Sequence, residues 1–423
     1  MPGGGVEAAA RPRLVLTSTF PVYPRVSGGQ QRTFYICKSL GLRFDVEIVS
    51  LTASHEPKRQ LALAPGLVET VVPKSIDHEA EEARRGAEMP FPVSDILSTV
   101  LIERSPAYLQ SLRDAASGAA GAILEHPYLF PALEALESPL PYFYDAQNVE
   151  FALKAESLPG TPAGNELTDI VRKVEGSVLA GARLVFFCTE EDRTTLVREF
   201  AVSGDKFVPT PNGVDTSEIP FIDAATRREA RESWFRRFRA LGGAENVRHT
   251  GLFVASLHGP NIDAADRLMS LAQQMPDVIF LIAGSICEYY RRWRIPPNIA
   301  LLGIITGATK ATLLKVADVG LNPMVLGSGS NLKMLDYLAS GLPVVTTLHG
   351  ARGLDLGGGV ASVRVTSIED FPHAVRELLE HPAAAADTIA ARRIVEREYD
   401  WAAIGGRVAD AVAGALDLRP VPA

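Results

Sequence analysis

A short polar loop in the C-terminal half leads into a helix-forming segment, and its residue types suit a phosphorylated ligand. Residues 327–330 read Gly-Ser-Gly-Ser, and Asn331 begins the helical segment. Free N–H groups at a helix N-terminus attract anions, and Lys333 adds a cation in the first turn. Asp336 is suited to accept hydrogen bonds from vicinal hydroxyls, such as those of a ribose. The pattern predicts a nucleoside-diphosphate site formed by Gly327, Ser328, Gly329, Ser330, Asn331, Lys333 and Asp336.

The two charged residues of this helix also have a simpler interpretation. Lys333 and Asp336 are three positions apart, a spacing at which side chains on one helix meet. An exposed ion pair of this kind contributes under about 1 kcal/mol to stability. The residues alone leave both interpretations open.

A second glycine-rich position follows the first apolar run of the chain. Gly28 and Gly29 stand at the start of a predicted helix over residues 30–40, where the backbone can approach an anionic ligand closely. The alternative is a flexible glycine turn. A G-x-G-x-x-G turn directly after the strand is absent, which argues against a nicotinamide dehydrogenase.

Polar side chains follow two predicted strands of the N-terminal half. His126 comes directly after the run 121–125 and is expected to project toward the ligand cleft, although strand-end histidines also serve structural roles. Asp145 and Asn148 follow the run 141–144 and are candidates for the acceptor side of a site. For Asp145, capping of the following helix is an equal alternative.

The elements that must position these residues are short apolar runs alternating with segments of helical period. Runs that are apolar on both faces are typical of parallel strands covered by helices on both sides. The pattern occurs twice, which predicts two Rossmann-like, doubly wound α/β domains with a ligand cleft at the carboxyl ends of their strands. The runs are 13–20, 44–51, 67–72, 121–125, 141–144 and 183–189, then 251–256, 278–284, 298–304, 319–323, 343–347 and 361–365.

The boundaries between these domains follow from composition. Residues 210–220 are dense in Pro, Gly, Asn and Asp, which is typical of a linker. Residues 77–88 form a charged insert, expected to be a mobile surface region. The predicted parts are a flexible start (1–12), an N-terminal acceptor domain (13–209), a linker and helix (210–243), a C-terminal donor domain (244–400), and a helix crossing back with a tail (401–423).

Composition excludes several classes of protein. The chain has 423 residues, of which 47% are hydrophobic and 22% charged, so a largely disordered chain is excluded. A net charge of −8 argues against a nucleic-acid partner. Three scattered cysteines form neither a disulfide framework nor a zinc cluster, and no apolar run is long enough to span a bilayer. We therefore expect a cytoplasmic protein.

One charged helix suggests a membrane contact. Residues 227–239 interleave arginines with Trp234, Phe235 and Phe238, a composition that suits peripheral binding at the inner membrane face. The alternative is a linker helix whose aromatic residues pack against a domain.

Motifs for metal and hydrolase chemistry are missing from the sequence. No D-x-D pair follows a strand, and no two histidines have metal-ligand spacing, so no metal is predicted. No G-x-S-x-G elbow is present, which argues against a serine hydrolase.

The segment 327–347 (GSGSNLKMLDYLASGLPVVTT), with HGARGL behind it, resembles the donor-binding region of a known family. This family is the GT-B fold retaining glycosyltransferases of the family 4 or group 1 type, which are related to sucrose and mannosyl transferases. Residues 253–268 resemble the family's opening strand, loop and helix of the C-terminal domain, and 211–215 (PNGVD) is similar to its interdomain linker. The Gly28-Gly29 loop resembles the glycine loop of its N-terminal domain.

The resemblance implies transfer of a hexosyl group from a nucleotide-diphosphate sugar to a hydroxyl-bearing acceptor. It further implies retention at the anomeric carbon, no metal and no cofactor beyond the co-substrate. The acceptor would be a small molecule, a glycan or a lipid-linked molecule. In this reading His126 binds or orients donor and acceptor near the anomeric carbon, and Lys333 neutralises charge on the leaving diphosphate.

The sequence departs from the family pattern at two places. Of two glutamates that the family separates by seven residues, this chain has Ser328 and Asp336. The family's Arg and Lys after the first C-terminal strand are replaced by Ser256, His258 and Asn261, so Lys333 and Arg32 would carry the diphosphate charge. Two alternatives stay open: a nucleotide-sugar epimerase on the same fold, and an inert GT-B binding protein, which Ser328 favours.

Overall fold

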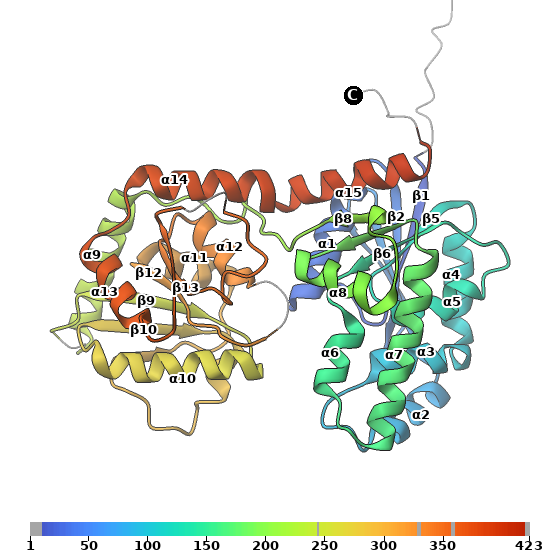
Figure 1. The fold of residues 1–423 in the computed structure, drawn as a ribbon, viewed down its shortest axis with the longest axis horizontal. Coiled ribbons are helices and arrows are strands. Elements are labelled where there is room, and N and C mark those ends of the chain that lie inside the picture. Colours follow the sequence, from blue (N-terminus) through green and yellow to red (C-terminus); the bar gives the residue numbers. More distant parts are fainter. Residues whose placement is uncertain (1–10, 243–244, 328–330, 357–359, 419–423) are drawn as a thin grey trace, which may run out of the picture. The chain divides into compact units, whose positions relative to one another are not determined.

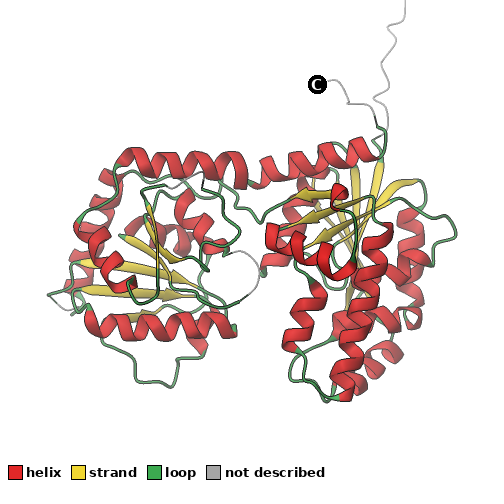
Figure 2. Cartoon of the chain, viewed as in Figure 1, coloured by secondary structure: helices red, strands yellow, loops and turns green. Residues whose placement is uncertain are grey.

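The chain folds into two compact units, each built around its own sheet. The computed structural model describes residues 11–242, 245–327, 331–356 and 360–418. The N-terminal unit comprises Met1–Pro211 and Ile404–Ala423, and the C-terminal unit comprises Asn212–Ala403. Helices and strands alternate along both units (Figures 1 and 2).

The N-terminal unit contains an eight-stranded sheet in the order β3-β4-β2-β1-β5-β6-β7-β8. Its neighbouring strands are parallel except for β3, which pairs with β4 in an antiparallel hairpin. The strands are β1 (Arg13–Ser18), β2 (Asp45–Thr52), β3 (Arg59–Ala64), β4 (Leu67–Pro73), β5 (Ala119–Leu124), β6 (Tyr142–Ala146), β7 (Leu184–Phe187) and β8 (Phe207–Pro209).

Helices follow these strands and bury apolar side chains against the sheet. The helices are α1 (Gly28–Leu40), α2 (Ile76–Gly86), α3 (Ser94–Leu101), α4 (Pro106–Ala116), α5 (Phe130–Glu134), α6 (Glu150–Ser157), α7 (Pro162–Gly181) and α8 (Glu190–Phe200), with short turns Ile102–Arg104, Pro127–Leu129 and Gly204–Lys206. Helix α8 begins with the capping box of Thr189 and Asp192, a pattern typical of an N-terminal cap followed by an acidic first turn.

The C-terminal unit contains a six-stranded sheet in the order β11-β10-β9-β12-β13-β14. All its neighbouring strands are parallel, so helical crossovers cover both faces and two apolar cores form. The strands are β9 (His249–Val254), β10 (Val278–Ala283), β11 (Ile299–Leu301), β12 (Val319–Asn322), β13 (Val344–Thr347) and β14 (Val363–Thr366). The helices are α9 (Ala224–Ala240), α10 (Gly259–Gln274), α11 (Gly307–Val316), α12 (Leu332–Ala339), α13 (Phe371–Glu380) and α14 (Ala385–Ile394), with turns Ser285–Glu288 and Val395–Tyr399.

The last helix, α15 (Trp401–Ala415), begins in the C-terminal unit and continues into the N-terminal unit. There Arg43 forms an ion pair with Asp410, and Arg183 donates to the carbonyl of Ala415. A Cβ atom on Gly405 would lie 2.3 Å from the Cβ of Ser39, so a glycine lets α15 approach α1 closely.

Each of the twelve predicted apolar runs overlaps a strand, whereas β3 and β8 were not predicted. Strand β3 alternates between half-buried and exposed residues at the edge of its sheet, so it lacks a continuous apolar run. Residues 77–88, predicted to be a mobile surface region, lie largely at the surface but are folded over most of their length. Most of this segment forms α2, which buries His78 and ties Glu82 to Lys74.

Candidate active site

The predicted phosphate loop lies between β12 and α12 in the C-terminal unit. Gly327 has a positive φ of 108°, a conformation that favours glycine, and its carbonyl accepts from Arg352 Nη1 at 2.6 Å. Ser328, Gly329 and Ser330 lie outside the described residues.

Asn331 occupies the position before α12 without capping it. Its Nδ2 donates to the carbonyl of Gly350 at 3.1 Å, and its side chain makes no hydrogen bond to the first amides of the helix. The first N–H groups of a helix have no partner within the helix. The N-terminus of α12 is therefore a site at which an anion can satisfy backbone donors. Gly341 lies just beyond the C-terminal end of α12 with a φ of 71°, a conformation that favours glycine.

Lys333 lies in the first turn of α12 among neutral groups. Its Nζ lies 3.3 Å from Oδ1 of Asn331 and 3.5 Å from Oδ1 of Asn261, and 5.1 Å from the ring centre of Phe253. No carboxylate forms an ion pair with it in the part of the chain that the structure describes. Burial lowers the pKa of Lys333 to about 8. The arrangement holds a largely desolvated ammonium beside helix amides that the Asn331 side chain does not cap.

Asp336 pairs with a lysine that sequence reasoning did not select. Lys310 of α11 donates to Oδ2 of Asp336 at 3.0 Å, so the alternative pair between Lys333 and Asp336 is wrong. Burial raises the pKa of Asp336, and the Lys310 ammonium opposes that rise. Lys310 is 26 residues earlier in the chain, so no local spacing could reveal it.

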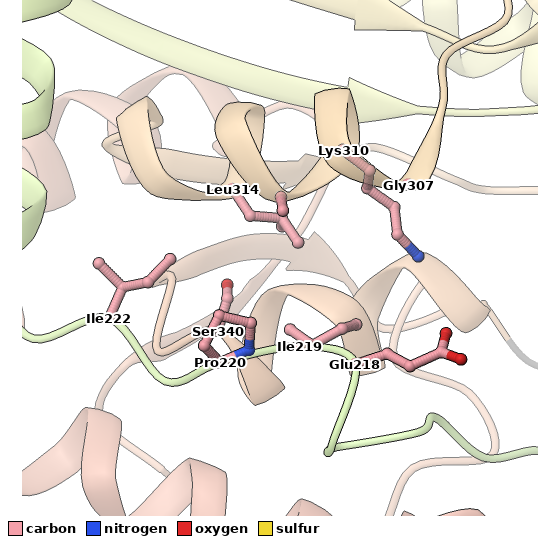
Figure 3. Close-up of a pocket in the computed structure, with 9 residues that line it drawn as sticks. Glu218, Ile219, Pro220, Ile222, Gly307, Lys310, Leu314 and Ser340 are labelled. Carbon is pink, nitrogen blue, oxygen red and sulfur yellow. The ribbon is translucent and has the colours of Figure 1, made fainter.

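A small pocket adjoins this ion pair on the side of Lys310. Its walls are largely apolar, and the Glu218 carboxylate and Lys310 ammonium lie at one end (Figure 3). The space inside is about 20 Å³, which suffices for one water molecule and not for a nucleotide. Its lining consists of Glu218, Ile219, Pro220, Ile222, Gly307, Lys310, Ala311, Leu314 and Ser340.

In the N-terminal unit, Gly28 and Gly29 form the first turn of α1. The helix begins two residues earlier than predicted because Ser27 and Gln30 form a capping box. A Cβ atom on Gly29 would lie 2.9 Å from Oε1 of Gln147. Gly29 therefore has a packing role at the end of β6, beside any role in approaching a ligand.

Arg32 and Asp145 form a buried ion pair, which corrects the roles predicted for both. Nη2 of Arg32 lies 2.6 Å from Oδ1 of Asp145, and Nη1 donates to the carbonyl of Thr210 at 2.7 Å. Arg32 has 0% of its surface exposed and Asp145 4%. Neither side chain is available at the surface of this unit, so Arg32 has no place for a diphosphate and Asp145 none for an acceptor. Asp145 is not observed as a helix cap either.

His126 follows β5, and its ring lies between two carboxylates. Nδ1 lies 3.9 Å from Oε1 of Glu125, and Nε2 lies 3.9 Å from Oε1 of Glu150. The ring stacks on Tyr128 at 6.0 Å between centroids. The His126 side chain is 15% exposed, and its Nδ1 has no hydrogen-bond partner among the described residues. The unpartnered Nδ1 is buried, so a ligand can contact only the exposed part of the imidazole.

Glu150 links His126 to a second predicted residue. It accepts hydrogen bonds from Asn148 Nδ2 at 3.3 Å and from the Tyr128 hydroxyl at 2.6 Å. The structure thus brings His126 and Asn148 together around one buried carboxylate. Sequence reasoning missed this carboxylate as a site residue because it begins a helix and carries no motif.

Helix α9 turns its aromatic face toward the core of the C-terminal unit. Phe235 is buried, and Trp234 and Phe238 pack against the same apolar cluster. Arg227 donates to the carbonyls of Leu314, Ala317 and Ser340. The alternative of a linker helix packed on a domain is therefore the one observed. None of the described helices is long and apolar enough to span a bilayer.

Comparison with known proteins agrees with this architecture. Residues 248–381 match the family model described as glycosyl transferases group 1. The chain is 27% identical over 223 residues to a phosphatidyl-myo-inositol mannosyltransferase of Mycolicibacterium smegmatis, covering 50% of this chain and 54% of that protein. The Mycobacterium tuberculosis protein of the same name is 27% identical over 226 residues, covering 50% and 56%. The chain thus spans about half the length of the curated relatives it matches.

Solved structures with the same fold cover nearly the whole chain. Sucrose-phosphate synthase from Thermosynechococcus elongatus has a TM-score of 0.69 at 14% identity, covering 96% of this chain and 100% of that one. HepE of Anabaena, solved with UDP and glucose, has a TM-score of 0.63 at 14% identity, covering 94% and 99%.

These likenesses define the class of the protein as a GT-B fold of two Rossmann-like domains. Within that class, residues 248–381 of the C-terminal unit match the domain of the group 1 glycosyltransferases. The resemblance to GT-B glycosyltransferases of the group 1 type is confirmed, and retention at the anomeric carbon stays a prediction.

Proposed function

We propose that this protein transfers a hexosyl group from a nucleotide-diphosphate sugar to a hydroxyl-bearing acceptor. The observation that carries the proposal is the position of Lys333, a cation without an acidic partner among the described residues, beside the uncapped N-terminus of α12. Both features lie inside the segment that matches the group 1 model.

In this proposal the donor diphosphate binds at the N-terminus of α12. Helix amides and Lys333 stabilise negative charge that grows on the diphosphate as the bond to the sugar breaks. Because Lys333 is desolvated, its interaction with that charge is stronger than it would be in bulk water.

Asp336 is proposed to bind the donor ribose. Lys310 contacts Oδ2 of this carboxylate, and no hydrogen bond to Oδ1 is recorded among the described residues. An ionised carboxylate accepts several hydrogen bonds, so Oδ1 can receive a ribose hydroxyl while Lys310 stays bound.

His126 and Asn148 are proposed to contact the transferred sugar and the acceptor. Glu150 accepts a hydrogen bond from Asn148 and lies 3.9 Å from Nε2 of His126, and the exposed part of the imidazole is the surface offered to a hydroxyl. Retention at the anomeric carbon and independence of metal are part of the proposal and rest on the sequence resemblance. A lipid acceptor is supported by the name of the mannosyltransferase relatives, and a UDP-sugar donor by the HepE complex with UDP-glucose.

Thermal stabilisation by nucleotide diphosphates tests the donor site. The panel consists of UDP, GDP, dTDP, ADP and NAD, with the matching nucleotide hexoses. A ligand at 100 times its Kd adds about 2.7 kcal/mol, a shift of a few degrees in Tm. We expect one nucleotide diphosphate to stabilise the protein. The Lys315→Ala variant should respond like wild type because Lys315 is exposed on α11, whereas Lys333→Ala should show a clearly smaller shift.

Product analysis then separates the possible activities. The selected donor is incubated with and without candidate hydroxyl acceptors, and the sugar products are identified. Transfer that depends on an acceptor supports the proposal. An altered nucleotide sugar formed from donor alone would indicate an epimerase, and binding without turnover would indicate an inert protein; either result would refute transferase activity.

A further inference from the structure

The segment between β10 and β11 forms a long connection in the C-terminal unit (Figure 1). It carries two exposed aromatic residues. Tyr289 is 39% exposed and Trp293 61% exposed. Their rings stack with centroids 5.6 Å apart and planes inclined by 24°. Exposed tryptophan is costly in water, so a stacked pair at the surface marks a candidate contact site.

The segment is anchored on α10, which holds these rings in place. Tyr290 is buried, and its hydroxyl donates to Oδ1 of Asp266 at 2.7 Å and approaches the carbonyl of Ile262 at 3.1 Å. Cys287 and Ile286 are buried beneath the turn. Because the buried side chains fix the backbone, the neighbouring side chains face solvent together.

The exposed side chains around the rings are strongly basic. Arg291, Arg292 and Arg294 are exposed, and Glu288 is the one acidic residue between 285 and 298, which gives this segment a charge of +2 in a chain of −8. Arg291 pairs with Glu288 at 3.1 Å, while no ion pair involves Arg292 or Arg294 among the described residues.

The acidic residues of α10 near this segment do not neutralise it. Asp266 accepts the Tyr290 hydroxyl, and Asp263 pairs with Arg267 at 2.9 Å. Arg292 and Arg294 therefore lie near exposed aromatic rings, with no acidic partner in the described part of the chain.

We propose that residues 288–294, here called the aromatic-basic loop, contact an anionic lipid bilayer. Tryptophan and tyrosine favour the boundary between headgroups and acyl chains, and arginines attract anionic headgroups. An acidic soluble partner would explain the exposed arginines. It would not explain the exposed rings of Tyr289 and Trp293. The proposal also places the membrane contact away from α9, whose aromatic residues are committed to the core. It does not depend on the proposed transferase activity.

Flotation of the full chain with lipid vesicles tests the proposal. Vesicles of phosphatidylcholine alone are compared with vesicles containing about 30% phosphatidylglycerol. We expect binding to the anionic vesicles only, and at least a tenfold loss of binding in the Arg292→Glu/Arg294→Glu variant. The matched control is Arg236→Glu/Arg237→Glu, which makes the same charge change at exposed positions of α9 and should bind like wild type.

Tryptophan fluorescence locates the contact by a second route. Of the three tryptophans, Trp401 is buried, Trp234 is partly buried, and Trp293 is exposed. Anionic vesicles should shift the emission to shorter wavelength, and Trp293→Phe should abolish this shift.

Several outcomes would overturn the proposal. These are absence of wild-type binding to anionic vesicles, equal binding to both vesicle types, and loss of binding in the α9 control instead of the loop variant. An emission shift that persists in Trp293→Phe would also place the contact elsewhere. Binding to a soluble acidic glycan without any binding to vesicles would identify a different partner.

Discussion

The guanidinium of Arg32 and the carboxylate of Asp145 form a buried ion pair at 2.6 Å, joining α1 to β6 inside the N-terminal unit. The pair also reaches Thr210, whose carbonyl accepts from Arg32. A residue that sequence reasoning assigned to a ligand therefore ties a helix, a strand and the end of the unit together.

Replacing Asp145 with Asn should strongly destabilise the protein. The change leaves Arg32 buried without a counter-charge, which typically costs about 3–5 kcal/mol. Chemical denaturation measures the free energy of unfolding. Asp410→Asn is the matched control, because its pair with Arg43 is exposed and should contribute under about 1 kcal/mol. Equal losses in the two variants would contradict a structural role for the buried pair.

Replacing Lys333 with Ala should lower kcat/KM by about 10²-fold, the scale of one lost electrostatic stabiliser. The binding of the nucleotide diphosphate should also depend on pH. Burial lowers the pKa of Lys333 to about 8, so the amine of the ligand-free protein is mostly neutral above that pH. Binding of the anion then requires protonation of Lys333, which costs free energy and weakens binding. Calorimetric titration should show affinity falling above pH 8 in wild type and no such fall in Lys333→Ala. Wild-type turnover by Lys333→Ala would refute the assignment.

Replacing Lys310 with Ala should destabilise the C-terminal unit more at pH 7 than at pH 5. The Asp336 pKa is raised by burial, so the folded state holds a proton on this carboxylate up to a higher pH than the unfolded chain does. The free energy of unfolding therefore falls as pH rises and Asp336 ionises. Without the Lys310 ammonium the pKa of Asp336 rises further, so this fall becomes larger. Denaturation at both pH values measures the effect.

The Lys310→Ala/Asp336→Asn double variant is the control for this prediction. Removing the carboxylate removes the buried charge that Lys310 neutralises, so the double variant should recover stability at pH 7. A double variant as unstable as the sum of the two single variants would show that the residues do not interact.

Glu175→Gln should flatten the pH dependence of stability. Glu175 accepts from the backbone N–H groups of Glu150 and Phe151 and from the Tyr144 hydroxyl, and burial raises its pKa to about 8. Between the unfolded value of 4.5 and 8 the folded state binds more protons, so the free energy of unfolding falls as pH rises.

The difference in free energy of unfolding between Glu175→Gln and wild type should shift in favour of the variant from pH 5 to pH 8. We expect this shift to exceed about 1.4 kcal/mol, the equivalent of one pKa unit. Glu166→Gln, an exposed position on the same helix, is the control and should follow the wild-type curve. Parallel curves for wild type and Glu175→Gln would show that Glu175 is ionised in the fold.

Much of the fold could be predicted because short apolar segments of the sequence identify most of the strands. Runs apolar on both faces, such as those containing β1 and β10, must be covered on both sides, and repetition of the pattern predicts two doubly wound units. The neighbourhood of Lys333 was also accessible, because the loop, the helix start and the cation lie within a few consecutive residues.

The partners of charged residues were not accessible in this way. Arg32 meets Asp145 across 113 positions, and Lys310 meets Asp336 across 26. The first pairing depends on the order β1-β5-β6 in the sheet and the second on the packing of α11 beside α12. Spacing along the chain carries no information about such neighbours.

Helix α9 and the aromatic-basic loop illustrate the difference between what the sequence determines and what the tertiary structure decides. The sequence alone determined two α/β units, through its repeated apolar runs. Its local motifs determined a candidate phosphate-binding loop before α12 and the resemblance to group 1 glycosyltransferases. It could not distinguish α9 from the aromatic-basic loop, since both interleave arginine with aromatic residues. Only the tertiary structure buries Phe235 and leaves Trp293 exposed, because burial depends on which surface a segment packs against.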